Sequence, residues 1–196
     1  MSADLELIAT VCHIYVVGAR RPASSCAIIP REMIAEAEQK VYDLLAGLGI
    51  TYDLHEHPPV YTVEEAERHW AGISGAHCKN LFLRNKKGNH HYLVILLGSK
   101  KADLRRLEQQ LSEDRLSFAS PERLLRCLGL QAGAVSPFGL INDRDKEVRV
   151  VIDQDLRTYN QVNFHPNVNT ATVGLSFPDF EKFLASCGNT VQFISI

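Results

Sequence analysis

The sequence predicts an α+β fold, in which a mixed, largely antiparallel curved sheet approaches a barrel and is surrounded by helices. Predicted strands outnumber predicted helices, and several strands follow one another closely enough to pair antiparallel. The clearest pair is 76–84 with 91–97. The connection between these segments begins with Asn85-Lys86-Lys87-Gly88, which has the composition of a hairpin turn.

Five helices are predicted from apolar spacing and from end signals. Apolar residues from Ile34 to Leu48 recur at helical spacing, and glycines stop that helix. Thr62 and Glu65 form a capping box for the second helix, and Pro121 suits the first position of the fourth. The five segments are 31–48, 63–70, 101–111, 121–128 and 178–186.

Further strands are expected where β-branched and aromatic residues gather between turn residues. Two loops between these elements are polar or rich in glycine. The strands are 51–55, 147–152, 161–164, 170–174 and 190–196, and the loops are 133–139 and 165–169.

The chain has 196 residues, of which 45% are hydrophobic. This is enough for one sizeable core, and we expect a single domain over 31–196. Residues 1–30 read as an N-terminal extension, because Pro22 and Pro30 bracket a stretch of small residues. An extra strand, a transit peptide or an artefact of the start site are the alternatives.

Charge and cysteine content restrict the class of protein. A formal net charge of -2 means that a basic field over the whole chain is absent, so composition alone does not suggest an RNA partner. The five cysteines are odd in number and widely spaced, which favours reduced thiols in a cytoplasmic protein. No apolar run reaches the roughly 18 residues of a membrane span, and we expect no membrane association.

Lys79 is the most informative single residue. Alternate residues of a strand share a face, so Lys79 lies with Leu81 and Leu83, and Asn80 lies opposite with Phe82. Both faces are partly apolar, and burying an unpaired ammonium group is costly. Lys79 is therefore a candidate functional residue. Alternatively, its stem reaches water at the start of the strand.

The loop from Gly133 to Pro137 is a second candidate. Gly133 lets the backbone approach a ligand closely, and Pro137 fixes the loop and removes a donor. Such a loop presents backbone N–H and C=O groups to a small polar ligand. An ordinary connection between two elements is the alternative.

His165 begins a third candidate segment, His165-Pro166-Asn167-Val168-Asn169-Thr170. A histidine before a proline is held extended, and its imidazole transfers protons near neutral pH. A turn in which the asparagines bond to their own backbone is the alternative.

Other histidines and cysteines give weaker signals. His55 and His57 are two residues apart and His90 and His91 adjacent, but neither pair has partners at metal-ligand spacing, so we expect solvated histidines and no metal. Cys78 beside Lys79 suggests a nucleophile, although neighbours on a strand point to opposite faces and a buried, inert thiol fits better.

Taken together, these segments resemble one family. They are similar to the free-standing relatives of the editing domain of bacterial prolyl-tRNA synthetases, the YbaK-like deacylases, and most of all to the alanine-specific branch (ProXp-ala, PrdX or ProX). The resemblance covers roughly residues 35–196. Its motifs, in order, are Thr62 after Pro58-Pro59, CKNLFL at 78–83, FASPE at 118–122, GAVSPFGLIND at 133–143 and HPNVNTAT at 165–172.

The resemblance implies hydrolysis of the ester that joins a wrong amino acid to the 3′ end of proline tRNA, without metal or cofactor. It implies that Lys79, His165 and Gly133 are catalytic. Lys79 then holds the terminal adenosine phosphate or polarises the ester, and both roles stay open. The residues it implies for substrate binding are Thr62, Asn80, Ser136, Pro137, Asn169 and Thr170.

Alanyl-tRNA(Pro) is the expected substrate. A cysteine-specific deacylase of the same family and a non-catalytic module that binds charged tRNA or an amino acid are the alternatives. We expect a monomer that meets mischarged tRNA(Pro) and, transiently, prolyl-tRNA synthetase. The predicted tRNA contacts lie in the densest positive stretches, where a solvated helix face is the alternative; they are Lys86, Lys87, Lys100, Lys101 and Arg105.

Overall fold

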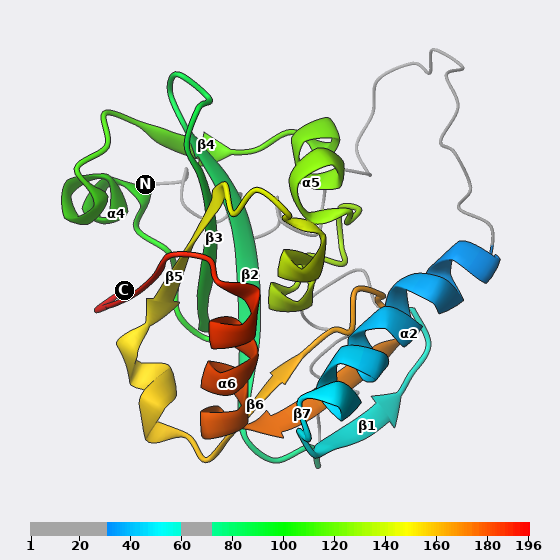
Figure 1. Cartoon of the computed structure of the whole chain (residues 1–196). Helices are drawn as coiled ribbons and strands as arrows, with labels where there is room; N and C mark the ends of the chain where they lie inside the picture. Colours follow the sequence, from blue (N-terminus) through cyan, green and yellow to red (C-terminus); the bar gives the residue numbers. More distant parts are fainter. Residues whose placement is uncertain (1–30, 60–71) are drawn as a thin grey trace.

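The computed structural model of the protein describes residues 31–59 and 72–196 (Figure 1), and the structural statements below concern these two ranges. Thr62, the predicted helix 63–70 and the N-terminal extension 1–30 lie outside them.

The described strands form one mixed sheet, as predicted. Its order is β1-β7-β6-β2-β3-β5-β8, and β4 pairs with β2 off this path. Four pairings are antiparallel and three are parallel. The sheet turns through a large angle between its β2–β3 part and its β1–β7 part (Figure 1). The strands are β1 (Tyr52–Glu56), β2 (Ala76–Asn85), β3 (His91–Leu97), β4 (Leu116–Phe118), β5 (Val148–Asp153), β6 (Gln161–Phe164), β7 (Ala171–Ser176) and β8 (Val191–Ile194).

Strand β2 joins the two parts of the sheet. Its first two residues, Ala76 and His77, pair with β6 in parallel. The residues from Cys78 to Arg84 pair with β3 in the predicted hairpin, and the end of the strand pairs with the short strand β4. Side chains in the first half of β2 are thus placed where the two parts of the sheet meet.

Helices cover the sheet close to their predicted positions. The exception is the helix expected from Lys101, which begins at Leu104 because the Asp103 side chain accepts hydrogen bonds from the backbone of Arg105 and Arg106. Lys101 therefore precedes the helix and does not share a helical face with Arg105, although the two residues are four apart. The helices are α2 (Arg31–Gly47), α4 (Leu104–Leu111), α5 (Pro121–Leu128) and α6 (Phe177–Cys187), with 3-10 helices η1 (Pro137–Asn142) and η2 (Gln154–Thr158).

Two hydrophobic clusters fill the two faces of the central strands. The larger lies between the sheet and helices α2, α5 and α6, and includes Phe82 and Phe138. The smaller packs Leu81 and Leu83 against Leu107 of α4. Burying each such side chain contributes roughly 1.5–3 kcal/mol. Alternation along β2 therefore places Lys79 on the face of the smaller cluster and Asn80 on the face of the larger one.

Candidate active site

Asn80 joins β2 to the loop 133–137. The side chain is 8% exposed, and its amide Nδ2 donates a hydrogen bond to the carbonyl of Val135 at 3.0 Å. Its Oδ1 is buried and has no hydrogen-bond partner among the described residues. Since buried polar atoms are normally paired, this oxygen is a candidate acceptor for a hydrogen bond from a ligand.

Gly133 borders open space beside this asparagine-bound loop. Its φ of +91° lies in the left-handed region, where other residues are strained, and a Cβ built on it meets no atom within 4 Å. The glycine is therefore required by the backbone conformation and not by a neighbouring protein atom. A Cβ at this position would point into space that the described residues leave open.

Ser136 ties this loop to the segment that carries His165. Its side chain is fully buried, and its hydroxyl donates to the carbonyl of His165 at 2.5 Å while it accepts from the backbone N–H of Phe138. Pro137, also buried, begins η1. Both residues shape the site by holding the loop, and contact with a substrate stays a prediction for them.

His165 has a defined tautomer. Its Nδ1 donates to the carbonyl of Ala171 at 2.8 Å, which leaves Nε2 as the acceptor of the neutral ring. Burial lowers the pKa of His165; the Ala171 bond opposes this shift, and the neighbouring His57 adds to it. The ring is therefore neutral near pH 7 and has one nitrogen available to accept a proton.

His57 packs against His165, so the prediction of a purely solvated histidine was wrong. The ring centroids are 5.8 Å apart in an edge-on arrangement, and His57 Nε2 lies 3.1 Å from the hydroxyl of Thr172. A signal for this residue was present in the sequence, since His57 and His165 both precede a proline. Thr170 lies alongside, where its carbonyl accepts from the backbone of His57, and Asn169 precedes it on the same partly exposed turn.

Lys79 points to the other face of β2. Its half-buried ammonium group donates to the carbonyl of Gly98 at 3.1 Å and to that of Lys100. Burial, and next the charge of Lys101, lower the pKa of Lys79. Among the described residues no hydrogen bond joins Lys79 to His165. The structure thus brings Asn80, the Gly133 loop and His165 together, and places Lys79 beside that group across the strand.

Lys100 is committed to contacts inside the protein. Its ammonium lies 2.8 Å from Asp153 and 2.7 Å from Asp155, and it donates to the carbonyl of Ile196. Burial lowers the pKa of Lys100, but the bonds to the two carboxylates outweigh that effect and raise it. Its charge is largely neutralised, which sets it apart from the other predicted tRNA contacts.

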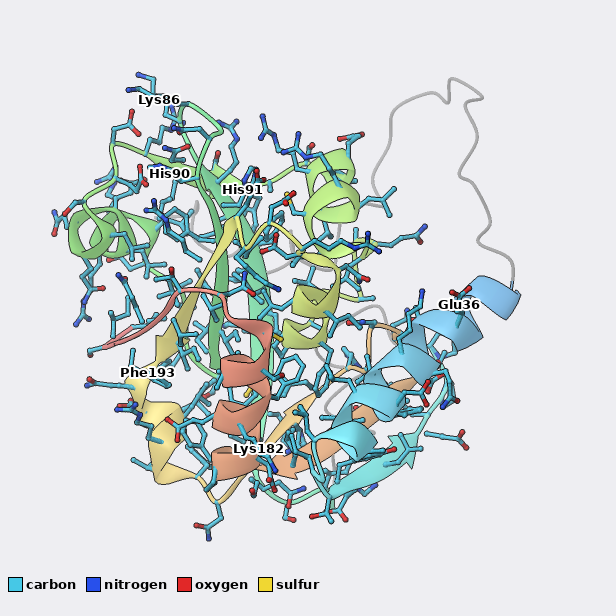
Figure 2. All side chains as sticks on the ribbon, viewed as in Figure 1. Glu36, Lys86, His90, His91, Lys182 and Phe193 are labelled. Atoms are coloured by element: carbon cyan, nitrogen blue, oxygen red, sulfur yellow. The ribbon has the colours of Figure 1, made fainter. Side chains whose placement is uncertain are left out.

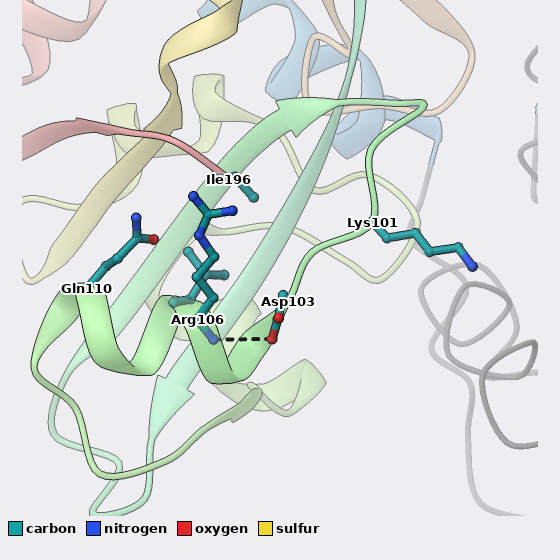
Figure 3. Close-up of a pocket in the computed structure, with 6 residues that line it drawn as sticks. Lys101, Asp103, Arg106, Gln110 and Ile196 are labelled. Atoms are coloured by element: carbon teal, nitrogen blue, oxygen red, sulfur yellow. Dashed lines mark hydrogen bonds between the residues drawn. The ribbon is translucent and has the colours of Figure 1, made fainter.

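The other predicted tRNA contacts are exposed. Lys86 lies at the tip of the β2–β3 hairpin (Figure 2), and Lys87 follows it in the same turn. Lys101 borders a surface hollow of about 220 Å³ near α4, and Figure 3 shows its side chain extending away from that hollow. Arg105 is on the exposed side of α4. These four cations are free to meet an anionic partner.

Other chemistry receives less support from the described residues. Within 31–59 and 72–196 no group of three histidine, cysteine or acidic side chains is arranged to hold a metal ion. No helix in the same ranges is long and apolar enough to cross a membrane. Cys78 is buried, and burial raises the pKa of its thiol to about 12, so it is an inert thiol, as expected.

Comparison with known proteins identifies the family. Residues 57–183 match the model of the aminoacyl-tRNA editing domain. The chain belongs to this family. The match extends from the end of β1 into α6 and includes every element of the site just described. It confirms the resemblance found in the ordered sequence motifs, and with it the assignment of the chain to a family of hydrolases.

Individual relatives agree with this assignment. The chain is 46% identical over 164 residues to the prolyl-tRNA editing protein ProX of Acetoanaerobium sticklandii, covering 84% of this chain and all of that protein. It is 37% identical over 162 residues to the mouse prolyl-tRNA synthetase associated domain-containing protein 1, covering 81% and 93%. The crystal structure of a candidate trans-editing enzyme for prolyl-tRNA synthetase has the same fold, with a TM-score of 0.62 at 22% identity, covering 82% and 97%.

Proposed function

We propose that the protein is a trans-editing deacylase that hydrolyses mischarged tRNA(Pro), and that alanine is the amino acid it removes. The observation that carries the proposal is the neutral group formed by Asn80, the Gly133 loop and His165. It combines open backbone, one unpaired buried acceptor and one available imidazole nitrogen. The names of the relatives support the choice of proline tRNA.

We place the aminoacyl group of the substrate at the Gly133 loop. The free Oδ1 of Asn80 accepts a hydrogen bond from the amino group of the substrate, and a backbone N–H of the loop stabilises the negative charge that develops on the ester oxygen. Aminoacyl esters are already activated, so holding water and ester in register is the main task. The site needs neither a covalent intermediate nor a cofactor.

His165 is the group that handles the proton. Water attacks the ester carbon, the bond to the ribose oxygen breaks, and that oxygen leaves as the hydroxyl of the terminal adenosine. Nε2 of the neutral ring accepts the proton of the water, and the neighbouring ribose hydroxyl shares in its transfer to the leaving oxygen. The Ala171 bond to Nδ1 keeps the ring in the tautomer that this step requires.

For Lys79 we favour the phosphate role over the ester role. The ammonium has three N–H donors, of which the carbonyls of Gly98 and Lys100 occupy two. It lies across β2 from Asn80 and near the Lys101 charge. A phosphate of the tRNA 3′ end therefore suits the third N–H better than an ester held at the Gly133 loop does.

Specificity follows from the size of the site. We place the substrate side chain between the Gly133 loop and the turn at Thr170, where a space sized for a methyl group would exclude the proline ring by steric clash. Exclusion by clash discriminates more sharply than the gain from one extra methylene. We propose that a monomer acts after the synthetase releases its product or during a transient contact with it.

One deacylation experiment tests the proposal. Purified protein is offered alanyl-, cysteinyl-, seryl- and prolyl-tRNA(Pro) under single-turnover conditions. Rapid hydrolysis of the alanyl form and sparing of the prolyl form are expected. Preference for the cysteinyl form would reassign the substrate, and binding of charged tRNA without hydrolysis would favour a non-catalytic module. Comparable hydrolysis of prolyl-tRNA(Pro) would contradict an editing role.

A further inference from the structure

The turn after β3 holds the Lys79 ammonium through backbone atoms alone. Residues 97–100 form this turn, which the Lys100 N–H closes by donating to the carbonyl of Leu97. The Gly98 N–H donates to the carbonyl of His77 at 2.8 Å, so one end of the turn is fixed to β2. Two carbonyls of the turn, those of Gly98 and Lys100, accept from Lys79. The position of the ammonium therefore depends on where Lys100 places its carbonyl.

The side chain of Lys100 anchors the other end of this turn. It extends to Asp153, whose side chain is fully buried at the end of β5, and to Asp155 in η2. The ammonium of Lys100 also donates to the main-chain carbonyl of Ile196 at 3.0 Å. Three acceptors from two separate parts of the chain thus hold one flexible side chain, which is more than a solvated surface lysine has.

We infer that Lys100 is a positioning residue, which acts with Asp153 to fix the Lys79 ammonium for the reaction and makes no contact with tRNA. This inference rests on the proposed function of Lys79. A misplacement of about 1 Å at a reacting group can lower a rate about a hundredfold. A half-buried ammonium with one remaining donor therefore requires a turn that is fixed at both ends. Lys100 is thereby distinguished from Lys101, whose exposed side chain is free to meet a phosphate.

Removing the charge of Lys100 or of Asp153 distinguishes a positioning role of Lys100 from a tRNA contact. Lys100→Gln removes a cation, whereas Asp153→Asn removes an anion, so the two changes have opposite effects on the attraction of tRNA. If the pair positions Lys79, both variants lower kcat about tenfold and leave KM and its salt dependence nearly unchanged. If Lys100 contacts a phosphate, Lys100→Gln raises KM and reduces the salt slope by about one, and Asp153→Asn does neither; that result overturns the inference.

A readout independent of activity is the exchange of the Lys79 ammonium protons with water, observed by ¹H–¹⁵N NMR and assigned by loss of the signal in Lys79→Ala. In the unchanged protein the two carbonyl bonds slow this exchange. We expect exchange at least about tenfold faster in Lys100→Gln and Asp153→Asn, and no further increase in the double variant, because the two residues act as one unit. An unchanged Lys79 signal in Lys100→Gln overturns the inference, whatever the protein hydrolyses.

Matched variants keep the test decisive. Lys40→Gln removes the lysine of an exposed ion pair with Glu36 on α2, and it should change neither readout. Should Lys100→Gln fail to fold because Asp153 is left buried without a cation, Asp155→Asn weakens the same anchor at a half-exposed site and should shift both readouts less, in the same direction. If the unchanged protein hydrolyses no aminoacyl-tRNA, the proposed function fails, while the NMR result still decides whether the anchor holds Lys79.

Discussion

The two faces of β2 differ in how they hold their polar groups. On the Asn80 face, uncharged groups meet: a side-chain amide, backbone carbonyls, a serine hydroxyl and a neutral imidazole. On the Lys79 face, two ammonium groups, two carboxylates and three carbonyls meet within one short turn and its anchors. Lys79 and Asn80, adjacent on one strand, thus lie in two different environments.

Under the proposed function, each face binds a separate part of the substrate. A neutral, partly buried group suits the ester, where negative charge appears only during the reaction. A cationic group suits the permanent charge of a phosphate, which needs a fixed counter-ion. Under the proposed function, the strand between the two faces sets the spacing between the scissile bond and the phosphate. Four substitutions or conditions test this division, in order of decreasing expected effect.

Lys79→Ala should give the largest effect. Removing the ammonium should lower the deacylation rate by about a hundredfold or more, whereas the free energy of unfolding should change by no more than about 1 kcal/mol, because a partly buried charge is lost together with its bonds. Single-turnover deacylation and urea unfolding measure the two quantities. Lys79→Arg should not restore the rate, since a planar guanidinium cannot replace a compact ammonium between two carbonyls. Near-normal turnover in Lys79→Ala, or an unfolded variant, would show that Lys79 is structural.

Gly133→Ala tests the Asn80 face of β2 and should lower the deacylation rate less than Lys79→Ala does. The left-handed φ makes alanine strained by about 1–2 kcal/mol, and the new methyl group enters the space proposed for the aminoacyl group. We expect a rate about tenfold lower with alanyl-tRNA(Pro).

Gly49→Ala is the matched control. Gly49 has a φ of +63° and also has no atom within 4 Å of a built Cβ, but it lies at the end of α2. Both variants should lose similar stability in urea unfolding, and only Gly133→Ala should lose activity. Equal activity in the two variants would contradict the proposal that the aminoacyl group binds at this loop.

Stability should decline as the pH falls below about 6.5, the pKa of histidine in an unfolded chain. Burial lowers the pKa of His77, His91 and His165 in the folded protein. The unfolded chain therefore binds more protons than the folded one just below pH 6.5, which favours unfolding. The stability that these groups contribute is present above pH 6.5 and lost as the pH falls towards their folded pKa values.

Urea unfolding at a series of pH values from about 7.5 to about 5 measures this decline. The carboxylate of Glu113, whose pKa is lowered by its bonds to Tyr92, His90 and Asn85 against the opposing effect of burial, adds a loss only nearer pH 4.5. His165→Gln should make the slope between pH 6.5 and 5 shallower. A slope unchanged by that substitution would mean that His165 is protonated as readily in the folded protein as in the unfolded chain.

Replacing the exposed cations should have the smallest effect on the rate of the hydrolytic step. Glutamine at Lys86, Lys87, Lys101 and Arg105 together should raise KM and leave kcat unchanged. For every phosphate that the variant no longer neutralises, the slope of log affinity against log salt should fall by about 0.7–0.9. Binding measured between about 50 and 200 mM salt therefore shows how many phosphates this surface neutralises. An unchanged slope after all four replacements would rule this surface out.

Local signals predicted most of the fold. The hairpin of β2 and β3 follows from the turn composition at 85–88, and α5 follows from Pro121 and Gly129, which occupy its first and C-cap positions. Strand β4 was missed because three residues, Leu116–Phe118, are too short to show a period. The start of α4 was misplaced because Asp103 was not recognised as its cap.

The candidate site was predictable in part. Ordered motifs singled out Asn80, Gly133 and His165, and the structure brings these three together. The partners of Lys79 and Lys100 were not predictable, because Lys100 and Asp153 are 53 residues apart and nothing local marks two residues as an ion pair. A cluster of positive charge in the sequence therefore suggested a tRNA contact where the structure shows an internal anchor.

The pairing of β1 has a consequence for the newly made chain. β1 lies at one end of the strand order and pairs with β7, and His57 after β1 is 115 residues from its partner Thr172. During synthesis β1 is without its partner strand until β7 has been made. An unpaired strand edge of this kind is a site where misassembly begins. His57 can therefore contact His165 and Thr172 only after the segment that contains β7 has been synthesised.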